Sequence, residues 1–554
     1  LTMNNAEAAE FLTGILAAPD DDVPRLIYAD WLEENGSPRG EFIRVQCERH
    51  SLDERDPRFL DLLLRSEELL EQHGQEWADE LQQDVRKAIY TRGFIDTLTI
   101  RARALLESGE QLFQSVPVRW LRLNYVKGTA DKWNDCTALR NIQYLDLADL
   151  VVPDADMTAL LGARYLTNLR GLRIGGWGQP ISLQTAVTLS QAAFAEQLEV
   201  LDIRGTEQDI QNVLNSVRNH AGLPKLRELW LTAREGNVIS TDLQGIRTGE
   251  IETLCINGAL NRRGTEQLAT LPLGSLKQLS VTQIPAAGLK LLAEKGAFDH
   301  IEKLALSQGD PGMRAAGELF RDNHLQRCET LDLSAFRHLA SSENGHRFIE
   351  LLASHEPLRE LRVLRLLNLK EGQLRQIAES PHLQGLQSLI LQESSISVED
   401  MAALANSRMA SSLRRIVFDM TCPPADALVE LGKGNFSNLL EFRIDCTYGF
   451  VVHKAGLEAV LIPLIHSEAM PLLQRLSLLS LRLTEKTLEA VSRATTRREL
   501  RVFEFDGNDG SNDMMCQVLN SENLVRLKRL SLRHVRGLRR APKFRQKYGS
   551  RLVY

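Results

Sequence analysis

The sequence predicts an α/β solenoid in which short parallel strands line one face and helices cover the other. Three observations support this: an apolar pattern, L-x-x-L-x-L, recurs about 17 times; the 432 residues from Ile95 to Leu527 divide into 16 intervals of 27 on average; and helical stretches lie between the copies. One copy cannot bury its apolar side chains alone, so the copies must stack on their neighbours.

The strand of each copy is indicated by its last apolar positions, which alternate with variable residues as in a strand with one buried face. Ile, Val, Phe or Cys replaces Leu in several copies. The copies begin at Ile95, Val118, Ile142, Leu169, Leu198, Leu226, Ile251, Leu276, Ile301, Cys328, Leu361, Leu386, Leu413, Leu439, Leu473, Leu500 and Leu527.

Between the strands, apolar residues recur at helical spacing, as in Ala286–Lys295, Val398–Asn406 and Thr484–Arg493. A period near 27 with a helix in each copy resembles the ribonuclease-inhibitor type of leucine-rich repeat. That type carries Asn or Cys about three residues after the last strand leucine. This sequence has Thr206, Ile284, Ser394 or Leu481 there, so we expect a less regular ladder of turn hydrogen bonds.

Three regions are predicted: an all-α domain over residues 3–90, the solenoid over 91–535, and a basic C-terminal cap over 536–554. The first should contain four or five helices and close the exposed end of the solenoid. Tyr28 and Trp31 are expected on its core face, with Arg25 pairing to Asp30 or Glu33. The segment Arg533–Arg551, which overlaps the third region, holds eight basic residues and no acidic one.

The N-terminal region resembles the repeat-companion domain of planctomycete-type bacterial proteins, which typically precedes leucine-rich repeats. The resemblance is carried by Asp22-Val23-Pro24-Arg25-Leu26-Ile27-Tyr28-Ala29-Asp30-Trp31-Leu32-Glu33-Glu34, by Arg39-Gly40-Glu41-Phe42-Ile43-Arg44, and at the other end by Phe544–Val553. It implies a bacterial source and carries no established activity.

Composition excludes several classes of protein. The net charge of −7 gives no general attraction to nucleic acid or anionic membrane. No apolar run approaches a membrane span, and the start of the sequence has no secretory pattern. The seven scattered cysteines are typical of thiols in a reducing compartment, so we expect a cytoplasmic protein.

Searches for catalytic chemistry find no phosphate-binding loop, no H-E-x-x-H, no G-x-S-x-G and no dinucleotide-binding glycine motif. The histidines and cysteines lack metal-ligand spacing. The sequence therefore predicts no enzyme activity, no cofactor and no metal site.

The outward strand positions are the third, fifth and seventh of each copy, and their charges are mixed. The basic ones are Arg101, Arg122, Arg173, Arg204, Lys303, Arg365, Arg415, Arg443, Arg475, Arg529 and Arg533; the acidic ones are Asp146, Asp202, Glu228, Asp332, Asp419, Glu441, Asp445, Glu504 and Asp506. Nucleic-acid binding, which needs a continuous basic track, is therefore not the expected role of this face.

Aromatic residues at outward positions mark a candidate binding site, because Trp, Tyr and Arg dominate interface hot spots. The candidates are Trp120, Arg122, Tyr144, Arg173 and Trp230, together with Tyr448 and Phe450 of an insertion in one of two long copies. The rings of Trp120 and Tyr144 should point away from the leucine core, unless the N-terminal domain or a loop covers them. Their truncation should then change fold stability little.

These observations predict a non-catalytic scaffold or regulator that binds a partner protein through its strand face. Two alternatives remain open. One is binding of an anionic partner, nucleic acid or an anionic surface, through the basic C-terminal segment; the other is an enzyme with an unrecognised site in the N-terminal domain.

Overall fold

The computed structural model describes residues 5–18, 20–79, 85–115, 117–176, 180–220, 222–234, 238–239, 248, 250–308, 312–321, 323–336, 344–447, 456–538 and 542–554. The chain divides into two compact units. The first comprises residues 1–281 and 295–297, and the second comprises 282–294 and 298–554. Tyr448 and Phe450 lie outside the described residues.

The first unit opens with four helices: α1 (Asn5–Ala17), α2 (Val23–Glu34), α3 (Pro38–Ser51) and α4 (Phe59–Asp79). Its strands are β1 (Val85–Thr91), β2 (Phe94–Arg101), β3 (Trp120–Asn124), β4 (Tyr144–Asp146), β5 (Gly171–Gly175), β6 (Val200–Gly205), β7 (Glu228–Ala233), β8 (Val238–Ile239) and β9 (Thr253–Leu260). Between the strands come α5 (Ala102–Ser115), α6 (Asp154–Leu161), α7 (Leu183–Gln191), α8 (Glu207–Asn219) and α9 (Arg262–Leu268).

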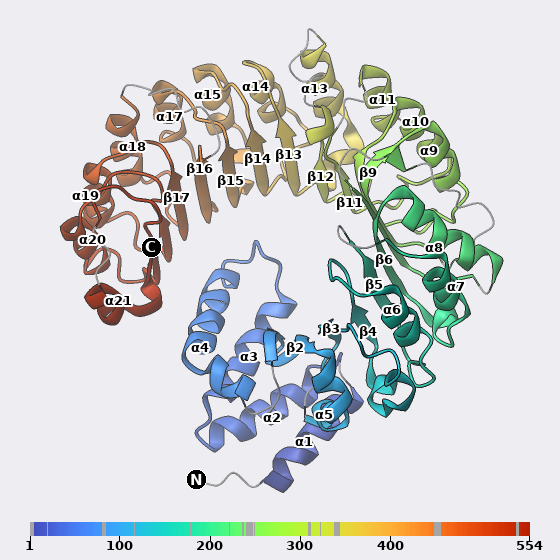
Figure 1. Ribbon diagram of the computed structural model, residues 1–554. Coiled ribbons are helices and arrows are strands. Elements are labelled where there is room, and N and C mark those ends of the chain that lie inside the picture. Colours follow the sequence, from blue (N-terminus) through green and yellow to red (C-terminus); the bar gives the residue numbers. More distant parts are fainter. Residues whose placement is uncertain are drawn as a thin grey trace. The chain divides into compact units, whose positions relative to one another are not determined.

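Strands β2 to β7 pair in parallel and in chain order, and β9 pairs in parallel with β7. Strand β10 (Gln278–Gln283) begins in this unit and pairs with β9. Figure 1 shows the helices α6, α7 and α8 together on one side of the strands β4, β5 and β6.

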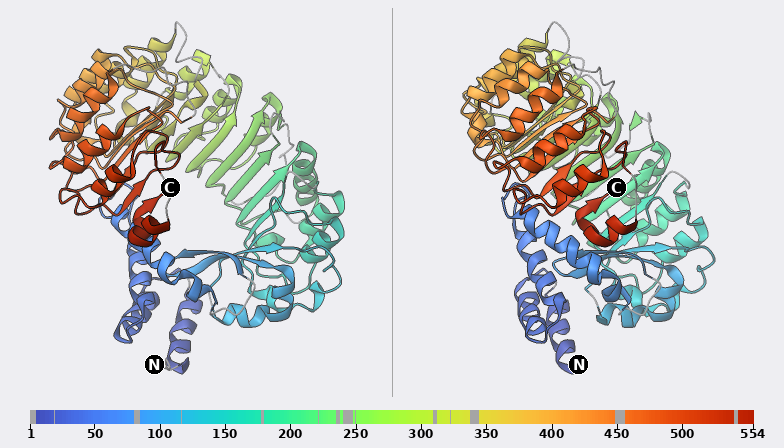
Figure 2. Two further views of the ribbon diagram at one scale, coloured as in Figure 1. Left: turned by 60° about the vertical axis from the view of Figure 1, so that its left-hand side comes forward. Right: turned by 90° about the vertical axis from the view of Figure 1, so that its left-hand side faces the viewer.

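The second unit repeats this arrangement with the strands β11 (Lys303–Leu306), β12 (Thr330–Asp332), β13 (Val363–Leu367), β14 (Ser388–Gln392), β15 (Arg415–Asp419), β16 (Glu441–Asp445), β17 (Arg475–Leu479), β18 (Val502–Glu504), β19 (Arg529–Ser531) and β20 (Leu552–Val553). From β12 on, each strand is parallel to its predecessor. Its helices are α10 (Ala286–Glu294), α11 (Gly312–Leu319), α13 (Gly345–Ser354), α14 (Gln373–Ala378), α15 (Val398–Asn406), α16 (Met409–Ser412), α17 (Ala425–Leu431), α18 (Leu457–His466), α19 (Glu485–Arg493), α20 (Asn512–Leu519) and α21 (Pro542–Tyr548). Figure 2 shows the strands of this unit side by side, with the helices along one face.

The predicted α/β solenoid is confirmed, because every predicted copy supplies one strand. In some copies, short 3-10 helices replace or extend the α-helix. They are Trp133–Asp135, Thr137–Asn141, Ala195–Gln197, Ser334–Phe336, Glu356–Glu360 and Gly549–Arg551. The pattern leucines are buried on the helix side; Leu121, Leu123, Leu364 and Leu366 are at most 1% exposed. The core therefore lies between the strands and the helices, and the third, fifth and seventh positions are left to the other face.

The strands end in a recurring way. Two residues after the last strand leucine, or its substitute, the backbone enters the left-handed region, which non-glycine residues adopt sparsely. The residues in this conformation are Tyr125, Asp149, Asn368, Glu393, Met420, Ser480 and His534. This conformation turns the chain away from the sheet toward the next helix.

The turn ladder is mixed, as expected from the copies that have no Asn or Cys at this position. Ser394 accepts a hydrogen bond from Leu369 N at 3.1 Å, and Asn508 accepts from Leu481 N and Leu483 N at 3.0 and 3.1 Å. Ile284 and Leu481 fill the same position with buried aliphatic side chains. Only some copies therefore use a side-chain hydrogen bond here.

Buried carboxylates supply a second link between copies. Asp156, the third residue of α6, accepts hydrogen bonds from the backbone N–H groups of Gly128, Thr129 and Ala130 in the preceding copy, at 2.7 to 3.0 Å. Asp400 of α15 does the same for Gly372 and Arg375, which lie at the start of the preceding helix α14. Each carboxylate satisfies donors that a helix or turn leaves open at its start.

Strand β1 departs from the all-α expectation for residues 3–90. Residues 85–91 pair antiparallel with β2 through a two-residue turn, Arg92-Gly93, in which both residues have positive φ. Such a turn suits the twist of a β-hairpin. A Cβ on Gly93 would lie 2.3 Å from Ile43, so only glycine lets the hairpin approach α3 this closely.

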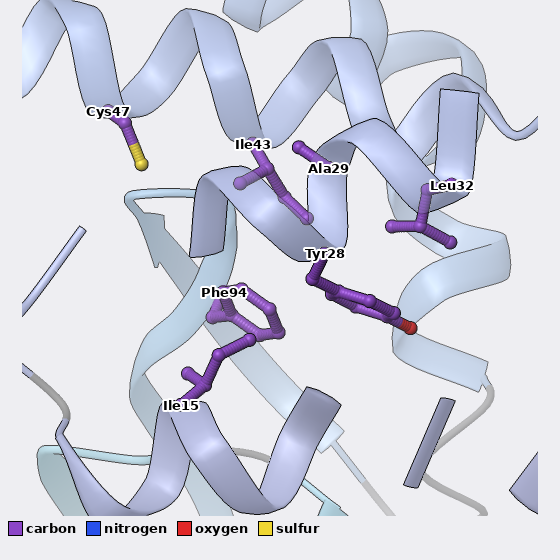
Figure 3. Packing of buried hydrophobic residues seen from close by; sticks show 7 residues of the cluster. All are labelled: Ile15, Tyr28, Ala29, Leu32, Ile43, Cys47 and Phe94. Carbon is purple, nitrogen blue, oxygen red and sulfur yellow. The ribbon is translucent and has the colours of Figure 1, made fainter. Parts of the chain in front are cut away.

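The core of the N-terminal helices reaches into this hairpin. Figure 3 shows Phe94 of β2 pointing between α1 and α2 toward Ile15 and Tyr28. Ala29, Leu32, Ile43 and Cys47 complete the buried cluster. The helices thus pack on the first strand of the solenoid through its own side chains.

Candidate functional site

The strand face of the first unit gathers most of the predicted site residues. Trp120 of β3 lies opposite Tyr144 of β4, with ring centroids 4.9 Å apart. The guanidinium of Arg173, from β5, lies 4.1 Å from the centroid of the Trp120 ring. We call Arg119, Trp120, Tyr144 and Arg173 the aromatic–arginine cluster.

A glycine makes this cluster possible. Gly171 stands opposite Tyr144 on β5, and a Cβ there would lie 2.2 Å from Cδ1 of the tyrosine ring. The missing side chain lets the tyrosine ring lean over β5. Trp120 then lies against that ring and reaches Arg173, one strand further than its own pairing partner.

Tyr144 is buried, with 8% of its surface exposed, whereas Trp120 is half-buried. The ring of Tyr144 is therefore packed, and we no longer expect its truncation to leave fold stability almost unchanged. The guanidinium of Arg119, an exposed residue, lies 5.1 Å from the centroid of the tyrosine ring. Burial alone would lower the pKa of Arg119, but a hydrogen bond to Tyr144 and nearby carboxylates raise it.

The fifth positions of β3 to β6 alternate in charge as Arg122, Asp146, Arg173 and Asp202. Arg122 binds Asp146 at 2.9 Å and donates to the carbonyl oxygen of Ala148 at 2.7 Å. The carboxylate of Asp202 lies 3.6 Å from Nε of Arg173 and 3.0 Å from Nη2 of Arg204. The Nη1 atom of Arg204 binds the carboxylate of Asp149 at 2.9 Å. The charged residues of this face are therefore linked to each other across the strands.

Trp230 borders the same network without joining the aromatic–arginine cluster. It is the register partner of Asp202 on β7, and its indole N–H lies 3.5 Å from Glu228. The structure thus brings Trp120, Tyr144 and Arg173 together, with Arg122 in the next row and Trp230 beyond Asp202.

Three contributors were not singled out from the sequence. Arg119 precedes the strand, and nothing in its spacing marks it. Gly171 carries a usable signal, since a glycine at an outward position beside an aromatic one leaves room for that ring. The alternating row could also have been found, because parallel register places fifth positions of successive copies side by side.

Residues 22–44, which carry the resemblance to the repeat-companion domain, have structural roles in this protein. Tyr28 is buried against Phe94, and Trp31 packs on Phe11 with ring centroids 5.6 Å apart. Asp30 and Glu33 bind Arg44 of α3, so the predicted pairing of these acids to Arg25 is wrong. A Cβ on Gly40 would lie 2.6 Å from the carbonyl oxygen of Ala29, which explains the glycine where α2 and α3 approach.

Arg25 is instead buried at the base of the hairpin. It donates to the carbonyl oxygen of Asp21 at 3.0 Å, and its guanidinium lies 5.5 Å from the centroid of the Phe94 ring. Burial and the neighbouring Arg92 lower the pKa of Arg25. This arginine supports the junction of the helices with β2.

Within the described ranges, no three His, Cys, Asp or Glu side chains gather in a way that would hold a metal ion. No described helix is long and apolar enough to cross a membrane.

No protein-family profile and no curated protein matches the chain. Among solved structures, a leucine-rich-repeat protein of Leptospira interrogans is 14% identical over 76% of this chain and 92% of its own, with a TM-score of 0.35. An internalin of Listeria monocytogenes is 13% identical over 77% and 92%, with a TM-score of 0.25. The Toll–Spatzle complex of Drosophila contains a chain 15% identical over 80% and 55%, with a TM-score of 0.33. This chain itself carries seventeen copies of L-x-x-L-x-L, each of which supplies one strand, and it therefore has the fold of a leucine-rich-repeat solenoid.

Proposed function

We propose that the protein is a non-catalytic scaffold or regulator that binds a partner protein through the strand face of its first unit. The observation that carries the proposal is the position of the Trp120 side chain. Its half-buried indole is held between the Tyr144 ring and the Arg173 guanidinium, on the face of the strands opposite α6, α7 and α8 (Figure 1).

This arrangement has the chemistry of an interface hot spot. A Trp and an Arg, fixed in advance by packing and ion pairing, lose little side-chain entropy when a partner covers them. Leucine-rich strands beneath them hold the backbone rigid. Trp230, farther along the face, would contact the same partner at its edge.

We also propose a setting for this function. Burial raises the pKa of the Cys47, Cys255 and Cys328 thiols to about 12, so they stay protonated and unreactive. Buried thiols of this kind fit a reducing compartment and support a cytoplasmic location. The resemblance of residues 22–44 to the repeat-companion domain supports a bacterial source, and the helix in most copies supports the ribonuclease-inhibitor subtype.

The division into three regions is part of the proposal. The N-terminal helices with the hairpin cover the first strand, and the C-terminal segment covers the last. In that segment, Arg551 donates to the carbonyl oxygens of Leu519 and Leu527 at 3.2 and 3.1 Å, and Asn520 donates to the Tyr548 hydroxyl at 3.1 Å. These contacts support capping as the main role of residues 536–554.

The test uses the full chain, immobilised, with an extract of the source organism. Proteins that bind the wild type but not Trp120→Ala are purified, and their affinities are measured by calorimetry. Loss of a hot-spot Trp should weaken the complex by at least about thirtyfold. Trp120→Phe should recover part of that loss.

The matched control is Arg365→Ala, because Arg365 lies on a strand face without a ring beside it. A partner that binds Trp120→Ala as tightly as wild type contradicts the proposal. If binding is instead lost with Lys543→Glu and Lys547→Glu and falls steeply with salt, the anionic-partner alternative is correct.

A further inference from the structure

In the ion pairs on the strand face of the first unit, the arginine side chain is more exposed to solvent than the aspartate side chain. The Arg122 side chain is 30% exposed and Asp146 12%; for Arg173 and Asp202 the values are 39% and 5%. Asp146 also accepts a hydrogen bond from Ala148 N at 3.0 Å. The carboxylates lie at the base of the face, and the guanidinium groups lie above them.

Arg173 has hydrogen-bonding capacity left within this arrangement. A guanidinium carries five N–H donors. The Arg173 contacts to Asp202, at 3.6 Å, and to the Trp120 ring, at 4.1 Å, are too long or of the wrong kind to be hydrogen bonds. Its Nε is shielded from solvent and makes no hydrogen bond within the described part of the chain. Because this Nε is shielded, the donors open to a ligand are the terminal Nη groups of a side chain that is 39% exposed, and Asp202 and Trp120 orient them.

We propose that the partner presents an acidic segment to this face, and that Arg173 receives one of its carboxylates while Trp120 packs against an apolar side chain beside it. The inference rests on the proposed function and names the partner's chemistry. A carboxylate is the planar acceptor that matches the guanidinium fork.

The exposed charges around the cluster favour the same partner. Arg119 and Arg101 are exposed, whereas the 35% exposed Arg204 side chain is paired with Asp202 and with Asp149, whose side chain is 33% exposed. The surface offered to a ligand is therefore more positive than the count of charged residues indicates. Nucleic acid fits less well, because Asp146 and Asp202 interrupt the arginines at every second strand and phosphate binding needs a continuous basic track.

Binding is tested with the full chain and a fluorescein-labelled peptide in which glutamates alternate with phenylalanine and glycine. Its counterparts carry glutamine or lysine in place of glutamate. The glutamate peptide should bind best, by about tenfold over the glutamine peptide, as expected for loss of a charged hydrogen bond.

Arg173→Ala should weaken the glutamate peptide by about tenfold and abolish its advantage over the glutamine peptide. Arg173→Lys should fall nearly as far, because lysine keeps the charge but neither the fork nor the stacking. Arg365→Ala, with a 42% exposed side chain 3.8 Å from Asp332, should leave binding unchanged. Circular dichroism and a urea titration confirm that each variant is folded.

Equal binding of the glutamate and glutamine peptides, or equal losses in Arg173→Ala and Arg365→Ala, would overturn the inference. Binding of the purified partner by the same variants distinguishes this inference from the proposed function. A partner that needs Trp120 but is insensitive to salt and to Arg173→Ala leaves the proposed function standing and refutes the acidic segment. A partner that needs neither residue refutes both.

Discussion

Arg173 in the first unit and Arg365 in the second occupy the same position of their copies, but Arg173 has an aspartate on both adjacent strands, whereas Arg365 lies between Asp332 and Ile390. Both are fifth-position arginines, with side chains 39% and 42% exposed, and both face an aspartate of an adjacent strand, at 3.6 and 3.8 Å. Arg173 also lies on the Trp120 ring. The outward positions of the described strands β11–β19 hold no aromatic residue.

The second unit pairs its charges with each other, both between neighbouring strands and along one strand. Arg415 binds Glu441 at 3.2 Å, Arg443 binds Asp445, and Ser477 donates to Glu504 at 2.5 Å. Ion pairs whose arginines reach solvent, as Arg415 and Arg443 do, contribute little to stability, roughly 0–1 kcal/mol each. The difference between the units shows that a ring, rather than a higher charge, distinguishes the candidate binding face from an ordinary strand face.

The largest expected effect concerns the buried ring of the first unit. Tyr144→Ala should lower the free energy of unfolding by about 3 kcal/mol, since it removes an almost fully buried aromatic side chain. Trp120→Ala, which removes a half-buried ring, should lose clearly less. Urea denaturation of the full chain measures both. Similar losses for the two variants would mean that the rings are equally packed.

The next effect tests the role of the missing side chain at Gly171. Gly171→Ala places a methyl group 2.2 Å from the tyrosine ring and should destabilise the chain by about 1–3 kcal/mol, as overpacking does. Thr330→Val, at the same position of β12 in the second unit, is the control and should be nearly neutral. If Gly171→Ala is equally neutral, the aromatic rings do not depend on that space.

A smaller effect compares the two arginines directly. A double-mutant cycle between Trp120 and Arg173 should give a coupling of about 0.5–1 kcal/mol, the usual strength of a partly exposed cation–π contact. The corresponding cycle between Asp332 and Arg365 should be weaker and should vanish in high salt. Equal couplings would remove the distinction between the units.

The smallest effect is a pH dependence confined to the second unit. Burial, followed by the charge of Asp445, raises the pKa of Asp419, against the opposing effects of Arg443 and Arg365; Glu393 adds to the rise. Burial alone would raise the pKa of Asp445 too, but hydrogen bonds from Thr447 and Arg443 outweigh it and lower that pKa. The two aspartates are register partners on β15 and β16.

The signs of the two substitutions are therefore opposite. At neutral pH, Asp419→Asn should stabilise the fold and Asp445→Asn should destabilise it, each by well under about 1 kcal/mol. The gain from Asp419→Asn should disappear as pH falls below the ordinary aspartate pKa. The loss from Asp445→Asn should shrink as pH falls from the ordinary value through the lowered folded pKa. Urea midpoints between pH 7 and pH 3 measure both, and parallel curves would contradict the assignment.

The repeat could be predicted from sequence because it depends on local periodicity. The L-x-x-L-x-L leucines and the helices at Ala286–Glu294 and Val398–Asn406 follow from patterns within one copy. The β1–β2 hairpin was missed, although Arg92-Gly93 between apolar runs is a turn signal, because the preceding residues had been assigned to helices.

The site could be predicted only in part, since it depends on contacts between copies. Register alone brings Trp120, Tyr144 and Arg173 to one face. The burial of Tyr144 depends on Gly171, one copy later, and the contact of Arg119 with the ring has no periodic signal. Side chains that cross two strands escape a method that reads one copy at a time.

The backward reach of Asp156 and Asp400 has a consequence for synthesis on the ribosome. The N–H groups of Gly128, Thr129 and Ala130 are satisfied by a carboxylate that is translated 26 to 28 residues later. A nascent copy therefore emerges with open donors and gains its final hydrogen bonds only when its successor has folded. Chain growth and folding proceed in the same direction, each new copy completing the one before it.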